Sequence, residues 1–380
     1  MQSQLDFSPP AAPEQAGVRA GDLEKINQIF DRQLAEGLHF AAQLVVARDG
    51  LVLVDRAAGS FGGQQVRHDT PFYTFSVSKA FTGMCVHKLA EEGKLSLDAP
   101  VAEYWPEFAR RGKGGITLRH IFHHTAGIHG FGRYRQIPQW PFWRLVTADV
   151  ASMTPEHPPG EKMAYHAVNY GFILGEVVRR VSGMRFEEYF QRTFARPLGL
   201  EHTWFRIPGK ALRRSPRVIS GCAEQNTLAR VFNLRPIRRA VIPAASLNST
   251  AREMAIFYQM LVNQGSYAGK QFLKPETVRP AVTLGYRGWD EINQRETLWA
   301  QGFHLGGRDP SDSPTKDEST FGSRSTQATF GHMGNRSSMA WGDMDHKVVV
   351  TFTCDRLLNY ETARQRWGEL NNAVWDLLGI

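Results

Sequence analysis

Residues 75–108 read FSVSKAFTGMCVHKLAEEGKLSLDAPVAEYWPEF, and the interpretation of the whole chain starts from this stretch. The apolar run over 78–92 predicts a buried helix that ends at Gly93, a residue suited to a helix C-terminus. Ser76 and Lys79 stand three residues apart at the start of that helix, so their side chains share one face. Burial disfavours a charged lysine, and a neutral Lys79 is the form that accepts a proton from the Ser76 hydroxyl.

The Ser-x-x-Lys spacing alone leaves two interpretations open. A helix N-terminus offers free N–H groups and a positive dipole end, which favour an oxyanion and hence a nucleophilic serine. The same residues also fit an ordinary helix cap. A second copy, Ser313-Pro314-Thr315-Lys316, lies in a polar stretch and is interpreted as chance. The Gly-x-Ser-x-Gly and His-Glu-x-x-His motifs of other hydrolases do not occur in the sequence.

The two ends of the chain carry the β-strand patterns. The runs FAAQLVVARDG (40–50) and LVLVDRAAG (51–59) meet at Asp49-Gly50, which predicts a hairpin. Near the C-terminus, strands are predicted over 328–333, 337–343 and 347–355, followed by a helix over 362–378. A first helix is predicted over 22–36. Strands from both ends therefore form one antiparallel sheet, which the first and last helices cover.

The middle of the chain, 95–300, is predicted to be helical and rich in loops. Its clearest helical patterns are 168–182, 185–195 and 250–264, the last capped by Asn248, Ser249 or Thr250. The polar segment 306–327 is predicted to be a surface loop. We expect an N-terminal arm (1–20), a discontinuous sheet domain (21–75 and 265–380) and a mainly helical domain (76–264).

Composition limits the class of protein. The chain has 380 residues, 42% of them apolar, and only 3 cysteines, which excludes a disulfide scaffold. We see no signal peptide and no apolar stretch long enough to span a membrane, and expect a cytoplasmic protein. The net charge of +8 fits a basic enzyme surface better than a nucleic-acid partner, because acidic residues are interspersed.

Four further motifs follow along the chain: ITLRHIFHHTAGI (116–128), PGEKMAYHAVNYGFILGEVVRRVSG (159–183), IPAASLNSTAREMAIFYQML (242–261) and FGHMGN (330–335). With Ser76-x-x-Lys79 they resemble the serine β-lactamase-like superfamily, in its class C β-lactamase fold, and within it most the family VIII carboxylesterases. The resemblance covers about 75–355. It implies an α/β (α+β) fold, with an antiparallel sheet flanked by helices and an inserted mainly helical domain.

The resemblance also implies roles for individual residues. Ser76 matches the acylated nucleophile and Lys79 the base beside it. Tyr165, five residues after Gly160, matches the second base and proton shuttle. Tyr170 is a rival that is better explained by packing. The oxyanion hole would consist of the backbone N–H groups of Ser76 and Asn335.

Two motifs depart from the family pattern. His332-Met333-Gly334 stands where Lys-Thr-Gly is usual, and a neutral histidine anchors a substrate carboxylate less well than lysine. Ala167 occupies the asparagine position of the Tyr-x-Asn motif, so either His166 or Asn169 is left as the stand-in. Both departures argue against efficient β-lactam turnover.

The histidine, arginine and aromatic clusters each admit a functional and a structural interpretation. His120 and His124 have a spacing that allows metal binding. These two histidines, together with His123 and His129, are better explained by core and hydrogen-bonding roles. We therefore expect no metal or other cofactor. The arginines at 213, 214, 217, 230, 235, 238 and 239 fit a solvated face, with an anion site at the cleft rim as the alternative. Most aromatic residues after the histidines are expected to pack. Tyr134 and Trp341 are candidates for an apolar acyl pocket.

These observations predict a carboxylesterase that acts on a small or medium ester through an acyl-enzyme on Ser76. The candidate substrate-binding residues are His332, Gly334, Tyr134 and Trp341. An acyltransferase, a weak β-lactamase or a D-amino-acid peptidase of the same fold are alternatives, as is a catalytically silent binding module. The expected partner is a small-molecule ester, without nucleic acid and without a membrane span.

Overall fold

The structure, a computed structural model, describes residues 4–7, 11–130, 137–307 and 320–379. One nine-stranded sheet runs through the described part. All its neighbouring strands pair antiparallel. In sheet order the strands are β3 (Gln64–Gln65), β2 (Leu51–Phe61), β1 (Ala41–Arg48), β14 (Val348–Cys354), β13 (Ser338–Asp343), β12 (Thr329–Gly334), β11 (His304–Leu305), β10 (Arg295–Trp299) and β9 (Tyr286–Asp290).

The sheet joins the two ends of the chain, as the strand patterns predict. β1 and β2 form the expected hairpin, and its turn residues Asp49 and Gly50 have φ of 50° and 82°. Positive φ at both central residues matches the right-handed twist of the flanking strands. β1 then pairs with β14, which comes from the far end of the sequence. The predicted antiparallel sheet is therefore confirmed.

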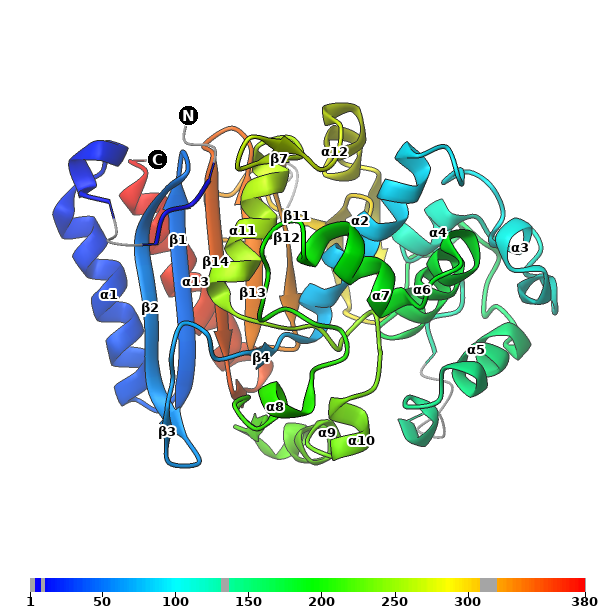
Figure 1. Ribbon diagram of the computed structural model, residues 1–380, viewed down its shortest axis with the longest axis horizontal. Helices are drawn as coiled ribbons and strands as arrows, with labels where there is room; N and C mark the ends of the chain where they lie inside the picture. Colours follow the sequence, from blue (N-terminus) through cyan, green and yellow to red (C-terminus); the bar gives the residue numbers. More distant parts are fainter. Residues whose placement is uncertain (1–3, 8–10, 131–136, 308–319, 380) are drawn as a thin grey trace.

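Two helices cover one face of the sheet. α1 (Ala20–Ala35) and α13 (Tyr360–Leu377) pack against each other and against the strands (Figure 1). Their apolar residues, such as Phe30 and Trp375, meet inward-facing strand residues such as Val350 in one buried cluster.

On the other face lies α11 (Ala251–Val262), against β1, β13 and β14 (Figure 1). Thr250 caps this helix, because its side chain accepts a hydrogen bond from the Glu253 N–H at 3.1 Å. The Thr351 hydroxyl donates to the Ala251 carbonyl at 2.8 Å and ties the helix to β14. α11 thus packs on the sheet, although the expected boundary at 264 assigns it to the helical domain. The division into domains stays a prediction.

The helical region is built around α2 (Ser78–Glu91), which is buried along most of its length and packs on α6 (Asn169–Ser182). The other helices are α3 (Val101–Tyr104), α4 (Leu118–Phe122), α5 (Trp143–Ser152), α7 (Phe186–Phe190), α8 (Gly209–Leu212), α9 (Asn226–Phe232), α10 (Arg235–Arg238) and α12 (Pro275–Ala281). Short 3-10 helices lie at Pro13–Ala16, Phe75–Val77, Pro106–Ala109, Ile137–Gln139 and Ala223–Gln225, and a π-helical turn at Gln191–Ala195 continues α7.

Small ladders join the two regions. β4 (Phe72–Tyr73) pairs with β6 (Asn248–Ser249), and β5 (Ile219–Ser220) pairs in parallel with β15 (Arg356–Leu357). β7 (Ser266–Tyr267) and β8 (Lys270–Gln271) form a separate two-stranded ladder.

One expectation about the middle of the chain is wrong. β9 and β10, which end at Asp290 and Trp299, lie inside 95–300, where helices and loops are expected. These strands are short and carry charged residues, and the residues of β9 alternate between more exposed and more buried positions. Their pattern is therefore weak in the sequence. Of the polar segment 306–327, and of the second Ser-x-x-Lys copy within it, residues 308–319 lie outside the described residues.

The described helices include none that is both long enough and apolar enough to cross a membrane. Cys85, Cys222 and Cys354 are all free thiols.

Two helical glycines give a matched test of the packing of α6 against the Ala244 segment. In Gly171→Ala the new methyl group would lie 2.1 Å from the backbone nitrogen of Ala244, so the segment beside α6 has to move. We expect a loss of about 1–3 kcal/mol in the free energy of unfolding. In Gly368→Ala, on α13, the methyl group meets no atom within 4 Å, and a gain of about 0.5–1 kcal/mol is expected. Denaturant unfolding measures both; a Gly171→Ala protein as stable as the parent would contradict the packing described.

Candidate active site

Ser76 lies in the 3-10 turn Phe75–Val77, directly before α2, and is half-buried. Its neighbour Phe75 has φ of 48°, a conformation that costs energy for a non-glycine residue and is held by its surroundings. The Ser78 hydroxyl donates to the Phe75 carbonyl at 2.5 Å and accepts from the Leu247 N–H at 3.0 Å. This turn presents the Ser76 side chain to the cavity described below.

Lys79 is fully buried beside Ser76, on the first turn of α2. Its Nζ lies 3.1 Å from Ser76 Oγ, 2.7 Å from the carbonyl oxygen of Ala167 and 3.3 Å from that of Ala244. Burial lowers the pKa of the amine well below its usual value. A neutral amine has two N–H donors and one lone pair. In the structure the Lys79 nitrogen donates to Ser76 Oγ as well as to the two carbonyls. A neutral amine with both N–H groups on the carbonyls would instead offer its lone pair to the Ser76 hydroxyl.

Tyr165 completes the group. Its ring centroid lies 4.8 Å from Lys79 Nζ, and its backbone N–H donates to the carboxylate of Asp290 at 3.1 Å. Burial raises the pKa of the phenol above its usual range, whereas a hydrogen bond with Ser76 lowers it. Tyr165 is therefore a protonated phenol at neutral pH. Tyr170, the rival tyrosine, donates instead to the Lys79 carbonyl at 3.3 Å within the core.

The end of β12 lies against the turn that carries Ser76. A methyl group on Gly334 would meet the Thr74 carbonyl oxygen at 1.9 Å, so only glycine permits this approach. The Ser338 hydroxyl donates to the same carbonyl at 2.6 Å and fixes the contact. Asn335, the next residue, has φ of 37° and lines the cavity together with Ser76. The two candidate oxyanion-hole residues are therefore neighbours in space.

His332, on β12, is a neutral group in this site. Burial is the main cause that lowers its pKa to about 3, with the nearby Lys79 second. Its Nδ1 lies 2.7 Å from the Met333 carbonyl, so Nδ1 carries the proton, and the buried Nε2 has no hydrogen-bond partner in the described structure. His124 and His304 flank the same aromatic cluster, and burial lowers their pKa values as well. The position that carries a lysine in the related motif is thus occupied by a neutral histidine here.

Neither residue considered as a stand-in for the family asparagine contacts Lys79. His166 Nε2 accepts from the N–H of Ile128 at 3.2 Å, and the Asn169 amide donates to the carbonyl of the same residue at 2.9 Å. Both side chains hold the segment after α4 in place. The Lys79 amine is bound instead by the backbone carbonyl of Ala167, the residue at the asparagine position.

The cavity at Ser76 has a volume of about 1230 Å³. The helical region gives it an apolar wall, formed by Phe75, Ile137, Trp140, Val168, Leu228, Phe232 and Ala245. The sheet side and α13 give it a polar wall that includes Asn293, Arg295, His304, His332, Asn335, Arg336, Arg364 and Glu369. The sequence carries no local signal for most of these residues, because they come from segments far from Ser76.

Of the two aromatic residues predicted for the acyl pocket, Trp341 lies elsewhere and Tyr134 is not among the described residues. Trp341 is fully buried; its ring stacks on Trp375 at 5.5 Å and its Nε1 donates to Asn371 at 3.0 Å. It packs between β13 and α13, so its assignment to the acyl pocket is wrong. Tyr134 lies outside the described residues.

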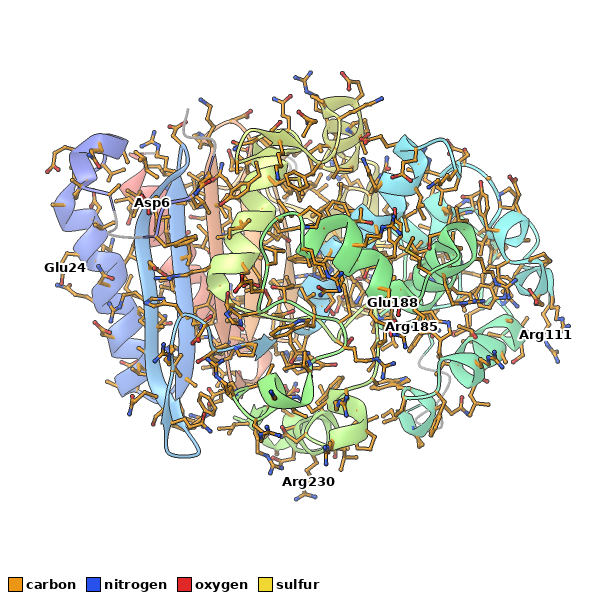
Figure 2. The ribbon with its side chains drawn as sticks, in the orientation of Figure 1. Asp6, Glu24, Arg111, Arg185, Glu188 and Arg230 are labelled. Carbon is orange, nitrogen blue, oxygen red and sulfur yellow. The ribbon has the colours of Figure 1, made fainter. Side chains whose placement is uncertain are left out.

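The histidine and arginine clusters have structural explanations. His120 Nδ1 accepts from the Thr117 N–H at 3.1 Å in a capping box. The described residues contain no group of three or more His, Cys, Asp or Glu side chains arranged to hold a metal ion. Arg238 is buried and donates to the Pro216 carbonyl at 3.0 Å, whereas Arg230 points away from the molecule (Figure 2). Arginines 213–239 are not among the described residues that line the Ser76 cavity.

Comparisons with known proteins identify the family of this chain. The family model described as Beta-lactamase matches residues 26–374. The protein named esterase/beta-lactamase LipL of Mycobacterium tuberculosis is 29% identical over 320 residues, which cover 77% of this chain and 70% of that protein. The implied family resemblance is thereby confirmed.

Two solved structures show the same architecture. The crystal structure of a penicillin-binding protein homologue from Caulobacter crescentus superposes with a TM-score of 0.79, at 26% identity over 95% of this chain and 98% of that chain. A family VIII carboxylesterase also superposes with a TM-score of 0.79, at 25% identity over 93% and 98%. The predicted fold is confirmed, and the chain belongs to the beta-lactamase family of serine hydrolases.

Proposed function

We propose that this protein is a carboxylesterase whose nucleophile is Ser76, with Lys79 as its base and Tyr165 as its proton donor. The observation that carries the proposal is the 3.1 Å contact between Lys79 Nζ and Ser76 Oγ, made by an amine whose pKa burial lowers well below its usual value. A nucleophilic serine needs a base within hydrogen-bond reach, and this geometry meets that requirement.

Acylation begins when Ser76 Oγ attacks the ester carbonyl carbon and its proton passes to the lone pair of Lys79. The carbonyl oxygen becomes an oxyanion, which the backbone N–H groups of Ser76 and Asn335 bind. The new ammonium group keeps its hydrogen bonds to the carbonyls of Ala167 and Ala244, which partly offset the cost of a buried charge.

The alcohol leaves when the tetrahedral intermediate collapses and its C–O bond breaks. The Tyr165 phenol gives its proton to the departing oxygen and regains one from the Lys79 ammonium, so the site returns to its starting charge. Water then attacks the acyl carbon on Ser76 and gives a proton to the Lys79 amine. The bond to Ser76 Oγ breaks, Ser76 regains its proton from the Tyr165 phenol, and the acid is released. The Lys79 ammonium returns a proton to Tyr165. Removing one such proton-transfer group costs typically about 10²–10⁴-fold in rate.

Two departures from the family motifs favour an ester over a β-lactam as substrate. His332 is neutral and so lacks the charge that lysine provides for a β-lactam carboxylate in related motifs. The asparagine side chain of the tyrosine motif is absent as well. The name of the family VIII carboxylesterase supports esterase chemistry for this chain, and LipL is named both an esterase and a beta-lactamase.

The nucleophile is tested with Ser76→Ala. We expect this variant to lose hydrolysis of 4-nitrophenyl esters to the background level and to lose covalent labelling by a serine-directed phosphonate. Ser313→Ala, in the second Ser-x-x-Lys copy, is the matched control and should retain both. Retained ester turnover in Ser76→Ala would refute the assignment.

The base is tested with Lys79→Arg and a pH profile. Because burial lowers the pKa of Lys79, wild-type kcat/KM should reach its plateau well below the usual lysine pKa and fall as the amine becomes protonated. Arginine stays protonated, so Lys79→Arg should lose about 10²–10⁴-fold in kcat.

Lys88→Arg on the same helix, where Lys88 pairs with Glu91 at 2.7 Å, is expected to behave like the wild type. A wild-type profile that keeps rising up to pH 10 would show that Lys79 is an ordinary charged lysine and would contradict the mechanism.

A further inference from the structure

The charged residues of the cavity differ in how they are neutralised. Four of them line it in the described structure: Arg295, Arg336, Arg364 and Glu369. Three have a partner of opposite charge: Arg336 pairs with Glu224, Arg364 with Glu361 at 3.1 Å, and Glu369 with Arg32 at 2.7 Å. Arg295 is the exception, since no ion pair or hydrogen bond of its side chain is found in the described part of the chain.

The acid nearest to Arg295 in register is already occupied. Arg295 is the first residue of β10 and lies opposite Asp290 of β9. The Asp290 carboxylate accepts hydrogen bonds from the Tyr165 N–H at 3.1 Å, the Ile292 N–H at 3.0 Å and the Asn293 amide at 2.5 Å. Asp290 therefore serves to hold the backbone of Tyr165 and the β9–β10 loop, and the guanidinium remains available.

Arg295 also acts on the reacting groups. Burial dominates the pKa values of Tyr165 and His304. The positive charge of Arg295 lowers both, although the negative charge of Asp290 raises the pKa of Tyr165 by a larger amount. The guanidinium is thus within electrostatic reach of the phenol beside Ser76. His332 and His304, its neighbours on the polar wall, are neutral. Arg295 is the permanent cation without an ion-pair partner among the described residues that line the cavity.

We propose that Arg295 is a specificity residue that binds a carboxylate of the substrate, so that the preferred substrates are esters with a free carboxylate and an apolar portion. A guanidinium offers two parallel N–H donors that match a carboxylate. The apolar wall with Trp140, Leu228 and Phe232 accommodates the remainder. This inference rests on the proposed esterase function and names the substrate class of the same site.

Matched ester pairs test the inference. In one pair the carboxylate is on the alcohol: 3-(butanoyloxy)benzoate against 3-(butanoyloxy)benzamide. In the other it is on the acyl group: the 4-nitrophenyl monoester of adipic acid against that of adipamic acid. The quantity measured is the ratio of kcat/KM for the anionic ester to kcat/KM for its neutral amide.

The wild type should prefer the anionic member of at least one pair, and added salt should reduce the preference. In Arg295→Gln the ratio should fall by about 10-fold or more, the size expected for one charge-assisted hydrogen bond. Arg295→Lys should restore part of it. Arg287→Gln is the matched control, because it removes the same charge from the neighbouring strand β9 at an exposed position, and should keep the wild-type ratio.

Two results would overturn the inference. If Arg295 acts only through the phenol of Tyr165, Arg295→Gln slows both members of each pair equally and the ratios do not change. Wild-type ratios at or below one in both pairs would exclude carboxylate binding. A wild type that hydrolyses no ester of either pair, and takes no phosphonate label on Ser76, would instead overturn the proposed function and this inference together.

Discussion

The site depends on one buried amine. Lys79 Nζ is removed from water and held by two backbone carbonyls, those of Ala167 and Ala244, beside the Ser76 hydroxyl. The desolvation of an ammonium group without a carboxylate partner is costly, so burial favours the neutral amine. The proposed mechanism uses the lone pair of that neutral form.

The surrounding packing explains why the carbonyls stay in place. Gly171 lets α6 lie directly against the Ala244 segment, and the Asn169 side chain anchors the start of the same helix to Ile128. On the sheet side, Gly334 allows β12 to touch the turn before Ser76. Ser76, the proposed nucleophile, therefore lies where the helical region and the sheet meet. The same meeting gives the cavity one apolar and one polar wall, on which the carboxylate proposal for Arg295 depends.

The sequence was sufficient for the parts of the fold that local periodicity encodes. Alternation and the Asp49-Gly50 turn predicted the hairpin and the shared antiparallel sheet, and helical spacing brought Ser76 and Lys79 together. β9 and β10 were missed because they are short and carry charges. Trp341 was misplaced because β13 is buried on both faces, so an apolar residue there does not reveal which face it occupies. The carbonyl of Ala167 and the guanidinium of Arg295 depend on tertiary contacts that spacing does not encode.

The most direct test of this account is the titration of Lys79 itself, followed by NMR of the side-chain Cε and Nζ atoms in lysine-labelled protein and assigned with Lys79→Met. The account predicts one lysine that takes up its proton at a pH well below the usual lysine pKa of about 10.4. A Lys79 amine that titrates with the exposed lysines would contradict it.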